Sequence, residues 1–241
     1  MNAPLSCHWV GRPQPAACSK RISWHFNILQ YLRSQPARLQ SCGEVPTSAG
    51  SNAIQLAVAA GYEVFTTASP KNFEYVKTPG ASRVFDYNDK STVDDLTHAL
   101  KGKSVAGAIS MGHGAAEACL DVIDKCDGER FVSMARYPMP NPLPKHFFLL
   151  QMVVYMVTWK ITHWFKCRAR NIRTNFIFGG TLINDEVGKA VYKDFLPKAL
   201  AGGTYMAAPD PCVVGKGLEY IQAGFDLQKK GMSAKKVVVS L

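Results

Sequence analysis

Several motifs that would identify an enzyme class are missing from this sequence. Its seven cysteines include no C-x-x-C pair, and no group of Cys and His residues has the spacing of metal ligands. The odd number of cysteines favours reduced thiols over a disulfide framework. There is also no G-x-S-x-G elbow, no P-loop and no Y-x-x-x-K pair. These absences argue against hydrolysis, metal catalysis and short-chain reductase chemistry, and we expect no metal site.

Long apolar runs are missing as well. The N-terminus has no apolar core behind its charges, which argues against a signal peptide. The most apolar stretch, "HFFLLQMVVYMVTWKITHWF", is interrupted by Gln151, Lys160 and His163, so its unbroken runs are far shorter than the roughly 20 residues of a spanning helix. We interpret this stretch as a buried or channel-lining segment, with membrane contact as the alternative. The expected location is the cytoplasm, with no membrane partner.

Acidic residues are scarce in a chain whose net charge is +10. Residues 1–42 hold five basic residues and no acid, and a second basic cluster runs from Lys160 to Arg173. A basic excess of this kind suggests nucleic acid as a partner. However, no nucleic-acid-binding motif accompanies either cluster. We therefore attribute the charge to an anionic cofactor and a solvated surface, and we expect no nucleic-acid partner.

A regular alternation of elements is present from Gly50 to Ala135. Helical patterns such as "SNAIQLAVAAG", "STVDDLTHALKG" and "GAAEACLDVIDKC" alternate with short apolar runs typical of buried strands, "YEVFTT", "SRVFDY", "VAGAIS" and "RFVSMA". Strands that alternate with helices at this spacing pair in parallel. The sequence therefore predicts an α/β fold with a Rossmann-type, doubly wound parallel sheet.

Three segments of unlike character divide the chain. Residues 1–42 show no sustained periodicity, and we expect an irregular segment there. Residues 43–180 are expected to form the Rossmann-like domain, with "TNFIFGG" as one more strand. Residues 181–241 contain an amphipathic helix, a strand-like piece, a helix from about Gly217 and a closing strand.

Two short stretches suggest a dinucleotide site. Thr47, Ser48, Ala49 and Gly50 begin a helix, where backbone N–H groups and hydroxyls could bind a pyrophosphate. An ordinary Ser/Thr helix cap is the alternative. The second strand ends about 20 residues later, where an NAD enzyme has a carboxylate for the ribose. This chain has instead Ser69, Pro70, Lys71 and Asn72, and a cation with small donors favours the 2′-phosphate of NADPH. A solvated lysine at a helix start is the alternative.

Residues after the third and fourth strands are weaker candidates. Tyr87 could pack on the adenine or the ribose, or it could be a tyrosine at the rim of the sheet without a ligand. The glycines of "SMGHG", Ser110–Gly114, allow close backbone approach to a cofactor. We interpret His113 as a surface loop histidine rather than an acid or a base.

Several stretches together resemble one protein family. "SAGSNAIQLA", "TTASPKNFEYVK", "GASRVFDYND", "FLPKAL", "APDPCVVGKGLEYIQ" and "SAKKVVVSL" are similar to the zinc-independent medium-chain dehydrogenase/reductase proteins of filamentous fungi. This family includes the trans-acting enoyl reductases that serve polyketide synthases. The resemblance extends from about Thr47 to Leu241. It implies that NADPH transfers a hydride to the β-carbon of an α,β-unsaturated acyl thioester, after which the α-carbon is protonated, without a catalytic zinc.

The resemblance also implies a role for particular residues. It matches Thr47–Gly50 to the pyrophosphate turn, Ser69–Asn72 to the 2′-phosphate site, and Tyr87 to a tyrosine that contacts the cofactor. Met134 and Ala135 match the edge of the fifth strand near the nicotinamide. The apolar segment of residues 147–165 and the stretch Phe176, Ile177, Phe178, Gly179 and Gly180 fall where the family places parts of its acyl tunnel. No residue is matched to a catalytic group. The resemblance implies an acyl thioester substrate, of the kind that a polyketide synthase carries, and we expect the chain to be a monomer or a dimer.

The N-terminal part departs from the family. Members have a GroES-like catalytic domain before the cofactor domain and read roughly "VWGGS" before the phosphate turn, where this chain reads "CGEVP". A one-base frameshift relates the two readings. We interpret Gly43–Pro46 as a damaged first strand, because Pro46 cannot donate a hydrogen bond within a central strand. The expectation is a truncated reductase with impaired activity, and the alternative is an inactive Rossmann remnant or a basic binding protein.

Overall fold

A computed structural model describes residues 38–43, 47–140, 142–144, 146–177, 180 and 186–241 of the 241-residue chain. In this part of the chain the strands are β1 (Arg38–Gly43), β2 (Glu63–Ala68), β3 (Arg83–Asp86), β4 (Val105–Met111), β5 (Phe131–Met134), β6 (Arg173–Phe176), β7 (Asp210–Lys216) and β8 (Lys235–Ser240). The α-helices are α2 (Ser48–Ala59), α3 (Phe73–Lys77), α4 (Thr92–Leu100), α5 (Ala115–Asp124), α6 (Phe148–Ala169), α7 (Glu186–Lys189), α8 (Leu196–Ala201) and α9 (Ile221–Lys229). Shorter helical turns are η1 (Pro70–Asn72), η3 (Ala190–Phe195) and η4 (Leu218–Tyr220).

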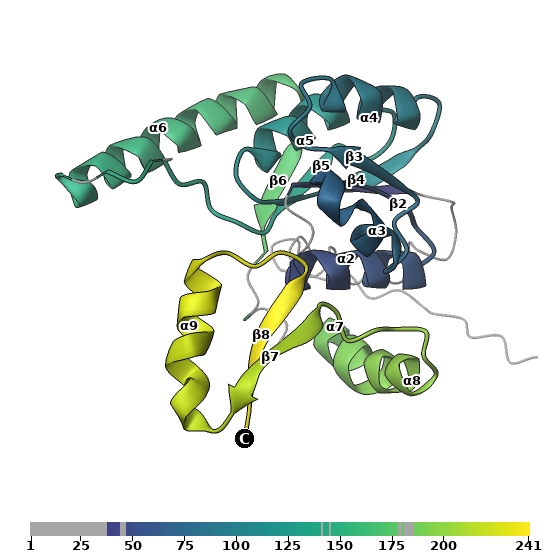
Figure 1. Cartoon of the computed structure of the whole chain (residues 1–241). Helices are drawn as coiled ribbons and strands as arrows, with labels where there is room; N and C mark the ends of the chain where they lie inside the picture. Colours follow the sequence, from purple (N-terminus) through teal and green to yellow (C-terminus); the bar gives the residue numbers. More distant parts are fainter. Residues whose placement is uncertain (1–37, 44–46, 141, 145, 178–179, 181–185) are drawn as a thin grey trace, which may run out of the picture.

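The first six strands form one parallel sheet in the order β3-β2-β1-β4-β5-β6. The chain thus winds outward from β1 in both directions, which makes the sheet doubly wound and places the change of direction between β1 and β4. Helices α2 and α3 lie on one face of the sheet, while α4 and α5 lie on the other (Figure 1). The predicted α/β fold with a Rossmann-type parallel sheet is confirmed.

The first strand is a correction to the sequence interpretation. We expected residues 1–42 to be irregular and the first strand to be damaged at Gly43–Pro46. Instead, Arg38–Gly43 form β1, which pairs in parallel with β2 and with β4. A ladder is built from backbone N–H and C=O groups, which any residue except proline supplies in full. Residues 44–46, which include Pro46, lie outside the described residues.

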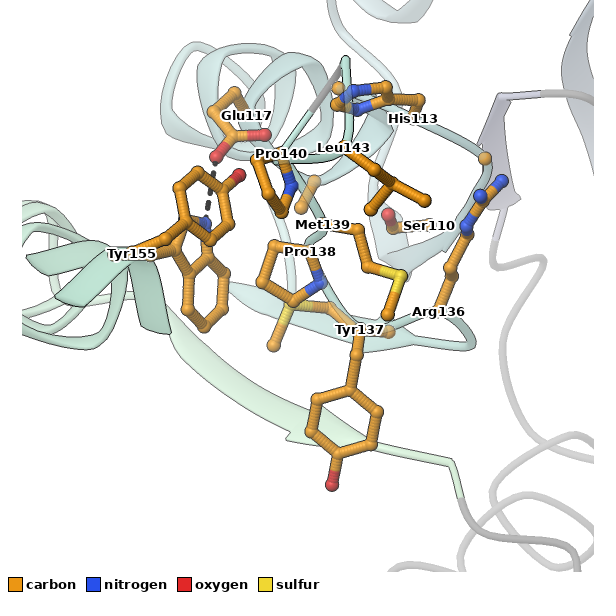
Figure 2. Close-up of a pocket in the computed structure, with 15 residues that line it drawn as sticks. Ser110, His113, Glu117, Arg136, Tyr137, Pro138, Met139, Pro140, Leu143 and Tyr155 are labelled. Carbon is orange, nitrogen blue, oxygen red and sulfur yellow. Dashed lines mark hydrogen bonds between the residues drawn. The ribbon is translucent and has the colours of Figure 1, made fainter. Parts of the chain in front are cut away.

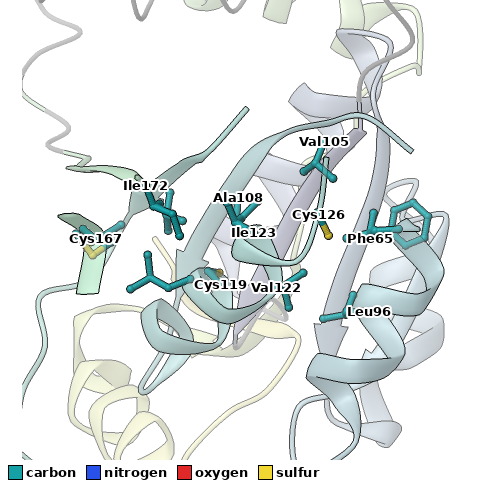
Figure 3. Packing of buried hydrophobic residues seen from close by; sticks show 14 residues of the cluster. Phe65, Leu96, Val105, Ala108, Cys119, Val122, Ile123, Cys126, Cys167 and Ile172 are labelled. Carbon is teal, nitrogen blue, oxygen red and sulfur yellow. The ribbon is translucent and has the colours of Figure 1, made fainter. Parts of the chain in front are cut away.

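Both faces of the sheet are buried, as the side chains of β2 show. Successive side chains of this strand point to opposite faces of the sheet. Val64 and Ala68 pack with Ile54 of α2 and with α3, whereas Phe65 packs with α4 and α5. The larger cluster, shown in Figure 3, joins residues of β2, β4 and β5 to the inner sides of α4, α5 and the end of α6. A strand buried on two faces favours apolar and β-branched residues, which explains why "YEVFTT" was predictable as a strand although Thr66 and Thr67 are polar.

Helix α6 corrects a second expectation. The segment of residues 146–165 was expected to be buried or to line a channel; the expected burial is wrong, whereas Tyr155 and Trp159 line a pocket. In α6 only His163 and Cys167 are buried, and Figure 1 shows the helix extending away from the sheet. An apolar composition predicts that a helix needs a partner surface, but it does not ensure that the rest of the chain supplies one. Within the described residues no helix combines the length and the apolarity needed to cross a membrane.

The C-terminal residues form a β7–α9–β8 unit in which the two strands pair in parallel. Hydrogen bonds attach the segment just before this unit to α2 of the sheet domain. Gln55 donates to the carbonyl of Met206 at 3.1 Å and accepts from its N–H at 2.7 Å, and Tyr205 donates to Asn52 at 2.9 Å. The last part of the chain is therefore anchored at the helix that follows β1.

We expect Leu120→Ala to lower the free energy of unfolding by about 2–5 kcal/mol, because it leaves a cavity between α5 and the sheet. Leu120 is 1% exposed, whereas Leu200 on α8 is 44% exposed and serves as a matched control. Urea denaturation of the two variants measures the difference. Equal losses of stability in Leu120→Ala and Leu200→Ala would contradict the assignment of the core.

Candidate dinucleotide site and adjoining pocket

The beginning of α2 provides the first part of the site. Thr47 caps the helix, since its Oγ1 accepts a hydrogen bond from the N–H of Gly50 at 3.2 Å. Thr47, Ser48 and Ala49 are exposed, Gly50 is buried, and the first turn contains no acidic residue. The N-terminus of a helix carries a partial positive charge and free N–H groups. These residues fit a pyrophosphate group, and the cap observed at Thr47 is compatible with that role.

The loop after β2 provides the second part. Lys71 is exposed and forms no ion pair with any carboxylate of the described residues, so its ammonium group is available to an anion. Asn72 is 5% exposed, and its side-chain amide donates to Ser69 Oγ at 2.9 Å and to Ser233 Oγ at 2.8 Å. An amide nitrogen has only two N–H groups. Asn72 therefore holds the loop and the C-terminal segment together.

The end of β3 adds an acid that sequence reasoning missed. Asp86 is paired in register with Ala68, so a carboxylate lies at the same sheet edge as Ser69. Its Oδ1 accepts hydrogen bonds from the N–H of Asn88 at 2.9 Å and from the Asn88 side chain at 3.0 Å. Parallel register brings Asp86 here, although it is 17 positions from Ser69 in the sequence. Tyr87, which follows it, is 40% exposed at the rim and open to a ligand.

The predicted residues of β5 lie at its carboxyl end. Met134 is 2% exposed, whereas Ala135 is exposed and donates from its N–H to the carbonyl of Ser110 at 2.9 Å. This bond ties the end of β5 to the end of β4. Met134 lines a pocket that opens at these two strand ends.

This pocket has a volume of about 650 Å³. It lies between the glycine loop after β4, the start of α5, the segment after β5 and the inner side of α6 (Figure 2). Apolar and aromatic side chains form much of its wall, namely Met134, Tyr137, Pro138, Met139, Pro140, Leu143, Tyr155 and Trp159. Crevices at the carboxyl ends of parallel strands, next to the change of winding direction, are the usual ligand sites of this fold.

Polar side chains also line the pocket. His113 and Arg136 are exposed at its edge, and Ser110 is buried at the end of β4. Glu117 accepts a hydrogen bond from Trp159 Nε1 at 3.2 Å, drawn as a dashed line in Figure 2. This bond joins α5 to α6 and fixes one wall. The sequence analysis did not identify Glu117 or Arg136, and it gave Tyr155 and Trp159 only as part of an apolar segment. Glu117 and Trp159 are 42 positions apart, so no local pattern in the sequence predicts that α5 and α6 are in contact.

The stretch predicted as an acyl tunnel lies beside the pocket rather than in its lining. Phe176 stacks on Tyr137, with ring centroids 4.2 Å apart, so it supports a residue of the wall from behind. Ile177 is 49% exposed and Gly180 is exposed. Phe178 and Gly179 lie outside the described residues. The tunnel assignment stays a prediction.

A Cys–His pair lies between α6 and β6. Cys167 Sγ is 3.4 Å from His163 Nε2, which is also 3.3 Å from Thr174 Oγ1. Burial lowers the pKa of His163 and raises the pKa of the Cys167 thiol. Both shifts favour the neutral forms, whereas a nucleophilic cysteine needs its thiolate. This pair is therefore a packing contact. No group of three or more His, Cys, Asp or Glu side chains in the described ranges could hold a metal ion.

Comparisons with known proteins relate the chain to fungal oxidoreductases. No family model matches the sequence. It is 52% identical over 195 residues to the dehydrogenase pigH of Monascus ruber, covering 81% of this chain and 53% of that protein. It is 46% identical to the zinc-binding alcohol dehydrogenase domain-containing protein cipB of Emericella nidulans, covering 80% of this chain and 53% of that protein. Identity to the trans-enoyl reductase himH of Aspergillus japonicus is 34%, over 81% of this chain and 50% of that protein. The chain thus spans about half the length of these relatives.

Solved structures share the fold. The CurK enoyl reductase superposes with a TM-score of 0.59 at 18% identity, covering 96% of this chain and 65% of that one. CurA of Vibrio vulnificus, solved in complex with NADPH, gives a TM-score of 0.57 at 13% identity, covering 90% of this chain and 60% of that one. At this level of identity the likeness concerns the fold.

Alkylation of the native protein tests the neutral state of the Cys–His pair. At mildly alkaline pH we expect iodoacetamide to modify Cys167 several-fold more slowly than Cys212, which is half-buried on β7, because burial raises the pKa of the Cys167 thiol and so lowers its thiolate fraction. Peptide mass spectrometry follows both sites, and denaturant should equalise them. Faster modification of Cys167 would reveal a thiolate activated by His163.

Proposed function

Because the chain belongs to the family of fungal dehydrogenases and trans-enoyl reductases, we propose that it is an NADPH-dependent oxidoreductase of the enoyl reductase type. In this reaction the β-carbon of an α,β-unsaturated acyl thioester receives a hydride, and the α-carbon then receives a proton. The observation that carries the proposal is the arrangement at one sheet edge. The start of α2, Lys71 after β2 and the apolar pocket after β4 and β5 all lie where this fold binds a dinucleotide and its substrate.

The cofactor would extend along this edge. Backbone N–H groups at Thr47–Gly50 would hold the pyrophosphate, and the exposed ring of Tyr87 would pack on the adenine or ribose. Met134 and Ala135, at the end of β5, would position the nicotinamide beside the pocket. When bound, NADPH supplies the hydride. The protein residues orient cofactor and acyl group and exclude water, so this proposal requires no metal.

Preference for NADPH over NADH would depend on the loop after β2. Ser69 stands where an NAD enzyme has a carboxylate, and the neighbouring Lys71 is an unpaired cation among the described residues. Asp86 lies at the same edge, but its Oδ1 is engaged by Asn88 within the turn after β3. A phosphate at Lys71 forms a charge-assisted contact that a free ribose hydroxyl does not.

The pocket suits an apolar acyl group. Its volume of about 650 Å³ lies in the usual range for small-molecule sites, and its walls are mainly aromatic side chains, prolines and methionines. A polyketide intermediate carried as a thioester on a synthase is the substrate class we propose, since himH is named a trans-enoyl reductase. The acyl group would lie between the segment after β5 and the inner side of α6.

Activity of these residues alone is proposed to be low. The chain matches about half of each relative, and the other half of those proteins has no counterpart in the aligned residues. Half of a shared active site orients a substrate less well than a whole one, and poor orientation slows catalysis strongly. We therefore propose weak NADPH binding and little turnover for this chain.

We expect Lys71→Ala to weaken NADPH binding about tenfold and to leave NADH binding nearly unchanged, because only NADPH presents a 2′-phosphate to the ammonium group. Titration of the purified protein, followed by cofactor fluorescence, measures both affinities. Lys77→Ala is the control, since Lys77 is also exposed but pairs with Glu74 at 2.7 Å. Equal effects of Lys71→Ala on both cofactors would refute the role of Lys71.

A fusion experiment tests the proposed activity. The unmatched half of the Monascus ruber dehydrogenase, joined to this chain, should raise the rate of NADPH oxidation with an enoyl thioester by at least about 100-fold over the chain alone, because it restores orientation of the substrate. Micromolar NADPH affinity with rapid turnover by the unfused chain would contradict the proposed impairment. Absence of NADPH binding together with salt-sensitive binding to DNA or RNA would favour the alternative of a basic binding protein.

A further inference from the structure

Helix α6 presents a continuous apolar surface to solvent. Its outer face, as we name it here, consists of residues at intervals of three and four, so that they lie on one side of the helix. These residues are between 49% and 63% exposed and are Leu150, Val153, Val154, Val157, Ile161 and Trp164. Contiguous apolar patches of this kind are rare on monomeric proteins and indicate an interaction surface.

The rest of the protein holds only the opposite side of α6. Trp159 packs against the larger core cluster and donates to Glu117, and His163 and Cys167 are buried against β6. The first half of the helix projects beyond the sheet (Figure 1). Tyr155 and Trp159 form a wall of the pocket on this inner side. The outer face is thus rigidly placed but packs on nothing among the described residues.

Charge indicates what covers this face. From Arg130 to Asn184 the chain has eight Lys and Arg residues and no Asp or Glu. Arg130, Arg170 and Arg173 form ion pairs with acids of the body, whereas Lys160, Lys166 and Arg168 on α6 form none within the described part of the chain. Lys160, Trp164 and Arg168 follow one another at intervals of four, so cations flank the apolar residues directly.

We propose that α6 binds the surface of an anionic lipid bilayer, lying along it with the outer face among the acyl chains and Lys160 and Arg168 at the headgroups. Apolar side chains combined with cations on one exposed helix are the chemistry of helices that lie in the membrane interface. Basic side chains near a cytoplasmic leaflet are attracted by its anionic lipids. The second half of α6 contains three cations, Lys160, Lys166 and Arg168. Cations within the helix fit a position along the bilayer surface and not one across the bilayer. This location differs from the sequence expectation of no membrane partner.

A second copy of the chain fits this face less well. Parallel pairing of two α6 helices would bring the unpaired cations of both copies together, and in either orientation α6 contains no acid to pair with them. The exposed apolar residues also form a broad strip: Leu149, at 77% exposure, and Phe165, at 62%, widen it on either side. A strip of this width exceeds the narrow seam of a two-helix contact and suits a fluid apolar layer.

Sedimentation with vesicles tests the proposal. The full chain is mixed with vesicles of phosphatidylcholine alone or with about one-third phosphatidylserine, and the bound fraction is measured at low and high salt. We expect binding to the anionic vesicles that weakens with salt, and little binding to the neutral ones. Lys160→Gln with Arg168→Gln should weaken binding about 30-fold, and Ile161→Ser with Trp164→Ser at least tenfold.

Matched controls separate these effects from loss of folding. Lys90→Gln with Lys101→Gln removes two exposed cations beside α4, and Leu218→Ser removes a side chain that is 68% exposed near β7. Neither control should change vesicle binding, and thermal unfolding of all variants should match that of the parent. The proposal is wrong if the parent chain fails to bind anionic vesicles, if the α6 variants bind as well as the controls, or if sedimentation velocity shows a dimer that Ile161→Ser with Trp164→Ser dissociates.

Discussion

The parallel pairing of β1 between β2 and β4 is the constraint on which the site depends. It aligns the carboxyl ends of three strands, so that the start of α2, the loop after β2 and the glycine loop after β4 meet at one edge. The change in winding direction falls beside this strand and leaves a crevice there. The ladder needs only backbone groups, and it therefore forms from "RLQSCG", a stretch with little apolar pattern.

The two halves of the site differ in chemistry. The side formed by α2 and the end of β2 is polar and carries the helix N-terminus and Lys71, whereas the side formed by β5 and α6 is apolar and aromatic. Such a division suits a ligand that is anionic at one end and apolar at the other. The carboxylate of Asp86 lies at the polar edge, but its hydrogen bonds to Asn88 direct it into its own turn.

Most strands were predictable from sequence because burial on both faces favours apolar and β-branched residues, as at Val64, Phe65 and Thr66. The first strand was not predictable, because Arg38–Gly43 show neither an apolar run nor a regular alternation in the sequence. Thr47 and Lys71 could be proposed as site residues because loops at strand ends are local features, and their roles stay predictions. The pocket wall could not be predicted, because the Glu117–Trp159 hydrogen bond joins residues that are 42 positions apart. The exposure of α6 could not be predicted either, because it depends on the absence of a covering surface among the described residues.

The bond from Asn72 to Ser233 has a consequence for biosynthesis. These residues are 161 positions apart, so Asn72 has emerged from the ribosome long before its partner is made. During translation the central strands can pair and bury their core while the loop after β2 still lacks this support. The Gln55–Met206 contact, across 151 positions, forms late for the same reason. The polar edge therefore reaches its final geometry only after Ser233 has left the ribosome.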